Sequence, residues 1–146
     1  MANALHWAGS IRHRDSVFAA YGHGRIAVID EHDIAAVAAA VLTSEGHDGR
    51  TYRLSGPEAL TPGEMTAVLA DVLGRPLRFV EVEPAVAGRA IVDHGVSQVM
   101  ADAIMALRAT ALESFTSIVH PTVQEITGAA PNRFRDWAAR HAADFA

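Results

Sequence analysis

Residues 22–27 are the part of this chain that most resembles a chemical motif. The run Gly22-His-Gly24-Arg-Ile-Ala27 satisfies the written pattern G-x-G-x-x-A, which in dinucleotide-binding proteins cradles a pyrophosphate. Such a cradle needs glycines that follow a strand and open a helix, because the N–H groups at the helix start bind the phosphates. Here the glycines precede an apolar run, residues 26–29, that itself predicts a strand. The pattern therefore does not predict nucleotide binding at this place.

Tyr21 and Arg25 have the spacing of the Tyr-x-x-x-Lys pair that many dehydrogenases use. That pair works because one helical face presents both side chains to the substrate. Two glycines lie inside the interval here and disfavour a helix, and arginine does not replace lysine in proton transfer. We therefore do not expect hydride transfer by this chain alone.

Eight histidines are present, but their spacing does not suggest a metal site. There is no His-x-His, no His-Glu-x-x-His and no cysteine to complete a zinc site. Asp30, Glu31 and Asp33 gather at one predicted helix start, where capping and the helix dipole explain all three. His141 falls on the apolar face of the last predicted helix, as a hydrogen-bonded core histidine would. The sequence predicts neither a metal nor another cofactor held by these residues.

The elements that position these residues follow from apolar periodicity and capping signals. The clearest signal is Thr61-Pro62-Gly63-Glu64, a capping box with proline at the first helical position, and Asp30 is a second N-cap. We predict strands at 17–21, 26–29, 50–55 and 77–82. Helices are predicted at 3–13, 30–42, 61–74, 85–94, 96–119 and 122–127, with a last one capped by Asn132. The expected fold is α/β, a small and largely parallel sheet of about three or four short strands with helices, followed by a helical C-terminal part.

Composition limits the environment and the partners. Half of the 146 residues are hydrophobic, so one domain over 1–146 with a real core is expected without disulfides. The formal net charge is −5 and arginine supplies all 12 basic residues, without a basic cluster, so nucleic acid is not an expected partner. No apolar run is long enough to span a membrane. We expect a cytoplasmic protein.

Several segments together resemble the C-terminal half of NmrA-like proteins, which are atypical short-chain dehydrogenase/reductase relatives that bind NAD(P). The resemblance is carried by Arg25-Ile-Ala-Val-Ile-Asp30 with Asp33-Ile34-Ala35, Thr51-Tyr-Arg-Leu-Ser-Gly-Pro-Glu58, Leu73-Gly74-Arg75-Pro76 and the closing Thr127-Gly128 with Phe134 and Trp137. It covers nearly the whole chain but only the second half of the family. The Rossmann half that carries the family's dinucleotide fingerprint is not in these residues.

The resemblance implies a substrate pocket walled by the opening segment, the loop at Tyr21 and the helices between residues 85 and 119. On that surface the sequence offers an apolar lining with few polar groups, as small-molecule pockets have. His94 is a candidate general base, because histidine changes charge near neutral pH, although a helix-end histidine is an equal reading. The candidate catalytic residues are His94, Asp93, Asp102 and Tyr21, and the candidate substrate-binding residues are Asn3, His6, Trp7, Met100, Met105 and Phe115.

Two kinds of function fit these observations. The first is a cofactor-independent cyclase, isomerase or lyase built on a reductase-like substrate half, which needs only a pocket, one acid or base and exclusion of water. The second is a non-catalytic small-molecule binding module, or half of a split NAD(P)-dependent reductase completed by a separate nucleotide-binding chain. Met1 as an internal residue of a longer reading frame is a further possibility.

The resemblance also has a structural consequence. In relatives, the strand that matches residues 51–55 adds to the large nucleotide-binding sheet. In this chain the same strand would be an exposed edge beside uncovered apolar surface. We expect a homodimer in which this edge or the adjoining helices are buried against a second copy.

Overall fold

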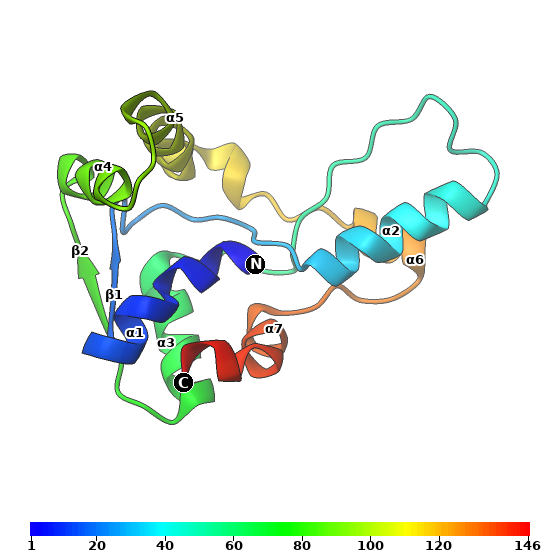
Figure 1. The fold of residues 1–146 in the computed structure, drawn as a ribbon. Helices are drawn as coiled ribbons and strands as arrows, with labels where there is room; N and C mark the ends of the chain where they lie inside the picture. The colour runs from blue at the N-terminus through cyan, green and yellow to red at the C-terminus, as the bar shows by residue number, and fades with distance from the viewer.

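The computed structural model describes all residues from 1 to 146 and has an α/β architecture rich in helix (Figure 1). Two short strands and seven α-helices alternate with short 3₁₀ turns. In chain order the elements are η1 (Ala2–Trp7), α1 (Ala8–Arg14), β1 (Ser16–Ala19), α2 (Glu31–Thr43), α3 (Pro62–Leu73), β2 (Arg78–Glu81), α4 (Pro84–Asp93), α5 (Gln98–Ala109), η2 (Thr110–Leu112), η3 (Ser114–Ser117), α6 (Thr122–Thr127), α7 (Phe134–Arg140) and η4 (Ala142–Phe145). None of the helices combines the length and the apolar character that a membrane crossing requires.

The two strands pair in parallel, so the predicted α/β class with a small parallel sheet is confirmed. Val17 pairs with Phe79 and Phe18 with Val80. Val17 is fully buried and faces the core, whereas Phe18 and Val80 on the opposite face are each 38% exposed. Parallel sheets are normally covered on both faces. This sheet is covered well on one face only.

The predicted count of three or four strands is not confirmed, because residues 26–29 and 50–55 form no strand. Ile26 makes one isolated antiparallel bridge to Leu60, and the N–H groups of Arg25 and Ala27 donate to the carbonyls of Ala111 and Thr116 at 3.0 and 2.8 Å. The backbone N–H groups of residues 51–55 donate to no backbone carbonyl. A strand needs a neighbour that continues the ladder, and no segment of these 146 residues supplies one.

The two helices predicted from the Asp30 and Thr61 caps are confirmed. The Thr61 hydroxyl accepts from the Glu64 N–H at 3.1 Å, and the Glu64 carboxylate accepts from the Thr61 N–H at 2.9 Å, which completes the capping box of α3. Gly74 ends α3 in the left-handed conformation, with φ 62°. Asp30 caps α2 by accepting from the His32 N–H at 3.0 Å. Local chemistry alone fixed these ends.

Three predicted helices differ in the structure. The helix expected over 96–119 ends at Ala109 and continues as η2 and η3, because the Thr110 hydroxyl donates to the Leu107 carbonyl at 2.6 Å and Glu113 is extended. The opening segment is a 3₁₀ turn before α1 instead of one helix. The last helix ends at Arg140, and its N-cap is Arg133. Asn132 does not cap it, because its amide binds Asp33 of α2 at 2.6 Å.

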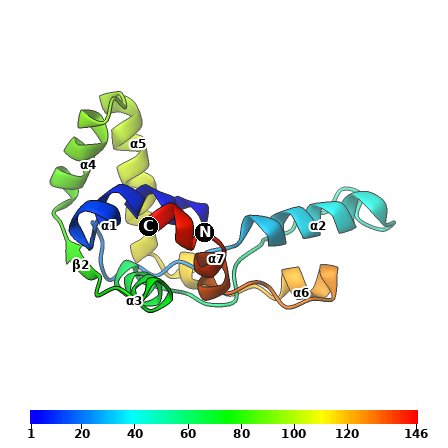
Figure 2. The ribbon, with the colours of Figure 1, turned by 60° about the horizontal axis from the view of Figure 1, so that its bottom comes forward.

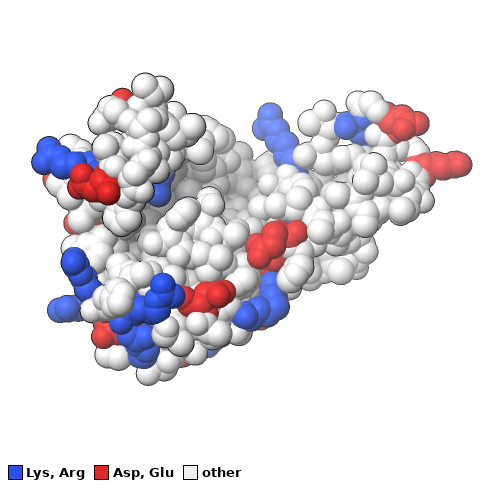
Figure 3. Space-filling view, viewed as in Figure 1, with Lys and Arg blue, Asp and Glu red and all other residues white.

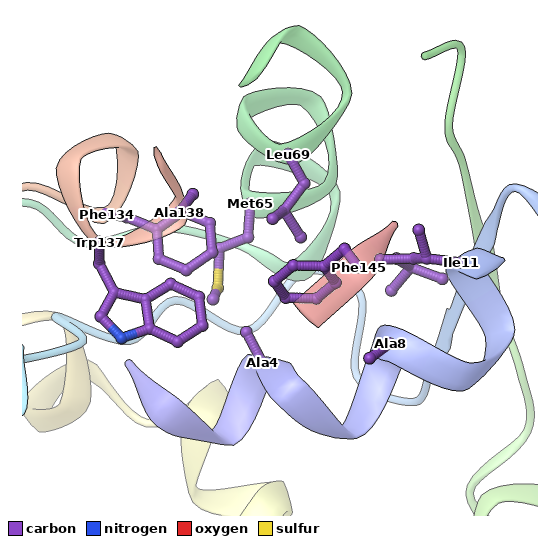
Figure 4. Packing of buried hydrophobic residues seen from close by; sticks show 10 residues of the cluster. Ala4, Ala8, Ile11, Met65, Leu69, Phe134, Trp137, Ala138 and Phe145 are labelled. Atoms are coloured by element: carbon purple, nitrogen blue, oxygen red, sulfur yellow. The ribbon is translucent and has the colours of Figure 1, made fainter. Parts of the chain in front are cut away.

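The core lies where α1, α3, α7 and η4 meet under the sheet (Figure 4). Trp137 is completely buried, stacks on Phe134 with ring centres 5.5 Å apart and meets Phe145 edge-on. Met65 and Leu69 of α3 complete this cluster from the other side (Figure 4). Seen from a second direction, α2 and α6 lie together and project away from this core, and α4 and α5 form a separate hairpin (Figure 2).

Two glycines give a matched test of backbone packing. A Cβ on Gly56 would lie 1.8 Å from the Val28 carbonyl oxygen, whereas a Cβ on Gly9 in α1 would meet nothing within 4 Å. We expect Gly56→Ala to lower the free energy of unfolding by about 2 kcal/mol or more through overpacking. Gly9→Ala should raise it by about 0.5 kcal/mol through helix propensity. Urea unfolding followed by circular dichroism measures both, and equal stability of the two variants would contradict this packing.

Candidate substrate pocket

A pocket lies where the loops after β1 and β2 meet. Both strands run in the same direction, so their outgoing loops reach the same edge of the sheet, the usual place for ligands in parallel sheets. The pocket has a volume of about 390 Å³, within the range of small-molecule sites. Its lining combines three apolar side chains with polar and acidic ones: Tyr21, His23, Glu81, Val82, Glu83, Pro84 and Leu112.

The loop that carries Tyr21 is held in one conformation. Tyr21 has a positive φ of 59°, which is uncommon for a residue with a bulky side chain. The Gly24 N–H donates to the Tyr21 carbonyl at 2.9 Å, and the Gly22 N–H donates to the Glu81 carboxylate at 2.8 Å. A Cβ on Gly22 would lie 2.7 Å from Glu81 Oε2, so only glycine allows this approach. Glu81 at the end of β2 thus positions the Tyr21 loop.

Arg25 anchors the far end of the same loop to α3. Its guanidinium binds Glu64 Oε1 at 2.6 Å and the Ala59 carbonyl at 2.8 Å. The Thr61 N–H, together with the Arg25 guanidinium, holds the pKa of the Glu64 carboxyl below its ordinary value. Glu64 therefore remains ionised to lower pH than a free glutamate, and the ion pair with Arg25 persists with it.

A second pocket of about 360 Å³ lies between α4 and α5. Asp102 and Met105, both predicted site residues, line it together with Arg89 and Gln98. Gln98 donates to Asp102 at 2.7 Å, which fixes the carboxylate along the helix surface. Pro84 lines both pockets, so the two cavities are neighbours on either side of the start of α4.

The predicted pair Asp93 and His94 lies in neither pocket. His94 follows α4 directly, about 15 Å along the helix from Pro84 at a rise of about 1.5 Å per residue. Its Nδ1 donates to the Ala90 carbonyl at 2.7 Å, as expected for a histidine at a helix end, and both side chains are exposed. The structure does not bring them to Tyr21.

The other predicted substrate-binding residues are also outside both pockets. Asn3 and His6 are exposed on η1, while Trp7 packs against the core cluster. Met100 and Phe115 are 55% and 59% exposed. Of the ten residues proposed from the sequence, the structure brings Tyr21 into the first pocket and Asp102 and Met105 into the second.

Sequence reasoning missed His23, Glu81, Glu83 and Leu112 in the first pocket and Arg89 and Gln98 in the second. A signal for two of them was available, because Glu81 and Glu83 stand at the carboxyl end of a strand that was predicted. The rule that ligands bind beyond the carboxyl ends of parallel strands would have pointed to that loop. No group of three His, Asp or Glu side chains is arranged to hold a metal ion.

The glycine pattern at 22–27 does not fit a pyrophosphate in the structure either. The Gly22 and Gly24 N–H groups already donate to Glu81 and Tyr21, and the next helix after these glycines begins only at Glu31. The Glu81 carboxylate would repel a phosphate placed there. Residues 22–27 therefore do not fit the phosphates of a dinucleotide cofactor.

Comparison with known proteins finds that the chain is similar to part of several named reductases. No family model matches it. The chain is 45% identical over 146 residues to the (4-alkanoyl-5-oxo-2,5-dihydrofuran-3-yl)methyl phosphate reductase of Streptomyces griseus, covering all of this chain and 51% of that protein. It is 37% identical over 145 residues to the NAD(P)H azoreductase of Xenophilus azovorans, covering 99% of this chain and 51% of that protein. The chain thus spans about half the length of the curated relatives it matches.

The fold is shared with a solved oxidoreductase. The crystal structure of an NADPH-dependent quinone oxidoreductase from Escherichia coli, in complex with NADPH, superposes with a TM-score of 0.84 over 95% of this chain and 49% of that chain. The sequence identity is 24%, so this likeness shows the fold alone. The resemblance to NmrA-like reductases is supported at the level of the family.

The expectation of a cofactor-independent cyclase, isomerase or lyase is wrong. The homologues that overturn it are named reductases and dehydrogenases, at up to 45% identity. The expectation rested on the absence of a nucleotide-binding motif from these 146 residues, and the match covers 51% of each of these two relatives.

The contact between Glu81 and Gly22 gives a test of the pocket's geometry. We expect Glu81→Ala to accelerate hydrogen exchange of the Gly22 amide about tenfold, because its acceptor is lost. Glu81→Gln should largely restore protection, since its side-chain oxygen can accept the same bond. Glu83→Ala is the matched control, as Glu83 makes no hydrogen bond to the loop. NMR-detected exchange measures all three, and unchanged protection in Glu81→Ala would contradict the positioning role.

Proposed function

We propose that this chain is the substrate-side part of an NAD(P)H-dependent reductase and corresponds to the C-terminal half of its relatives. The nucleotide-binding part lies outside these 146 residues. The observation that carries the proposal is an end-to-end match at 45% identity to about half of a named reductase. The poor fit of residues 22–27 to a pyrophosphate supports the same division of labour.

Uncovered apolar surface also supports this proposal. Phe18 and Val80 of the sheet, together with Leu112 and Phe115 beside the pocket, are between 38% and 59% exposed. In the space-filling view the hollow below the lobe of α4 and α5 shows mostly uncharged atoms (Figure 3). Large exposed apolar areas usually mark surfaces that another part covers. The nucleotide-binding part is the cover that we propose.

Within this function Tyr21 is the catalytic candidate that the pocket favours. Tyr21 lines the first pocket, which lies at the carboxyl ends of β1 and β2 and is called the carboxyl-edge pocket from here on. There its phenol can donate a hydrogen bond or a proton to a bound acceptor. Asp102 and Met105 are proposed to contact the part of the substrate that reaches the second pocket. His94, Asp93, Asn3, His6, Met100 and Phe115 remain proposals for contacts made once the nucleotide-binding part is in place. A single domain over 1–146 and a cytoplasmic location are also proposals.

Joining the chain to the unmatched half of the Streptomyces griseus relative tests this function. The chain alone should leave NADPH fluorescence unchanged, whereas the chimera should bind NADPH and consume it at 340 nm with a quinone or an azo dye as acceptor. Tyr21→Phe should lower the turnover about a hundredfold if its proton is used. Tyr52→Phe is the control, because its hydroxyl binds His47 instead of lining a pocket. Tight NADPH binding by the chain alone, or equal rates for both variants, would count against the proposal.

We also propose that the isolated chain forms a homodimer through residues 51–55 or the adjoining helices. The unpaired backbone of this segment supports a strand-to-strand contact, because exposed N–H and C=O groups attract a second strand. Tyr52→Pro should weaken the dimer by removing one donor, while Tyr52→Phe should leave it intact. Sedimentation at micromolar concentration measures both. A monomeric wild-type chain under these conditions would rule the dimer out.

A further inference from the structure

The charged side chains of the carboxyl-edge pocket indicate which class of substrate it binds, a question that the proposed function leaves open. We infer that this pocket selects a flat aromatic acceptor that carries positive charge, and that it disfavours a phosphorylated one. The inference rests on the proposed function only in naming the occupant a substrate. The pocket itself is given by the meeting of the two strand loops.

The charged groups in this cavity are two carboxylates and no arginine. Glu81 and Glu83 line it, and neither carboxylate takes part in any ion pair of the chain. One oxygen of Glu81 accepts from the Gly22 N–H, and the Glu83 side chain makes no hydrogen bond with the start of α4. No arginine or lysine lines it. A cation is therefore the ligand that neutralises these two carboxylates.

The remaining walls suit a flat ring. Val82, Pro84 and Leu112 supply apolar surface, and Tyr21 supplies an aromatic ring to which a cation is attracted. A volume of about 390 Å³ is sufficient for a molecule of two or three fused rings. An aromatic cation gains both from burying its ring against the apolar walls and from its attraction to the carboxylates. A neutral ring of the same shape gains only from the apolar contact.

A phosphate ester would be repelled by the same pocket. Its two negative charges would lie beside two carboxylates, and no guanidinium lines the cavity to bind them. Arg89 lines the second pocket, on the other side of Pro84 and together with Asp102. The chain thus differs in expected substrate charge from its Streptomyces griseus relative, whose name specifies a phosphate.

Three ring compounds of similar shape and different charge test the inference on the chain itself. Isothermal titration calorimetry at pH 7.5 would compare 1-methylquinolinium, uncharged quinoline and 1-naphthyl phosphate. We expect the cation to bind about tenfold more tightly than quinoline, and the phosphate not to bind measurably. Glu83→Gln should weaken binding of the cation up to about fivefold, as for an exposed charge pair, and leave the affinity for quinoline unchanged. Glu125→Gln on α6, an exposed glutamate outside both pockets, is the matched control.

The outcomes separate this inference from the proposed function. Equal binding of the cation and quinoline, or equal binding of the cation to wild type and Glu83→Gln, overturns the charge selection and leaves the pocket as a substrate site. Binding of 1-naphthyl phosphate that is lost in Arg89→Ala also overturns it, by assigning an anion to the second pocket. Binding of none of the three removes both the inference and the proposed pocket. Chemical shifts of the Gly22 amide report whether the bound cation occupies the expected cavity.

Discussion

The parallel pairing of β1 with β2 is the constraint on which the rest of the site depends. Val17 and its partner Phe79 turn one face of the sheet toward the core, where Trp137 and Leu69 are fully buried. Because the strands run in the same direction, both outgoing loops reach one edge. The Tyr21 loop and the residues after β2 meet there, and the Gly22 N–H, which donates to the Glu81 carboxylate, joins them. The aromatic core therefore positions the pocket through a sheet of only two strands.

The same sheet has one face that is poorly covered. Only 21 of its 146 residues are buried, and one sheet face together with much of α5, η2 and η3 presents large apolar side chains to solvent. A chain of this length and composition has enough apolar residues for a larger core. The curated relatives it matches are about twice as long. The nucleotide-binding part that we propose would account for both the exposed apolar surface and the partial match.

Sequence reasoning succeeded where structure is decided by neighbours in the chain. The capping box at Thr61 and the cap at Asp30 involve groups two or three residues apart, and the strands near Val17 and Phe79 follow from their apolar residues. It failed for residues 26–29, whose backbone partners come from Leu60, Ala111 and Thr116. An apolar run specifies burial, but only distant partners decide whether it becomes a strand. The prediction of the site failed for the same reason, because Glu81 acquires its role from a contact with Gly22, 59 residues earlier in the chain.

The glycines at 22 and 24 bear both on the poor fit of this loop to a pyrophosphate and on the geometry of the pocket. In a dinucleotide-binding loop, glycine N–H groups remain free for an anion. Here the Gly22 N–H already binds a carboxylate that belongs to the chain, and the absence of a Cβ is what allows Glu81 to come so close. An internal anion thus occupies the place that a phosphate would need. The contact that excludes the cofactor's phosphates also holds Tyr21 over the cavity and gives the cavity part of its negative charge. One glutamate can therefore account for both properties, because a fixed negative charge repels anions and attracts cations by the same interaction.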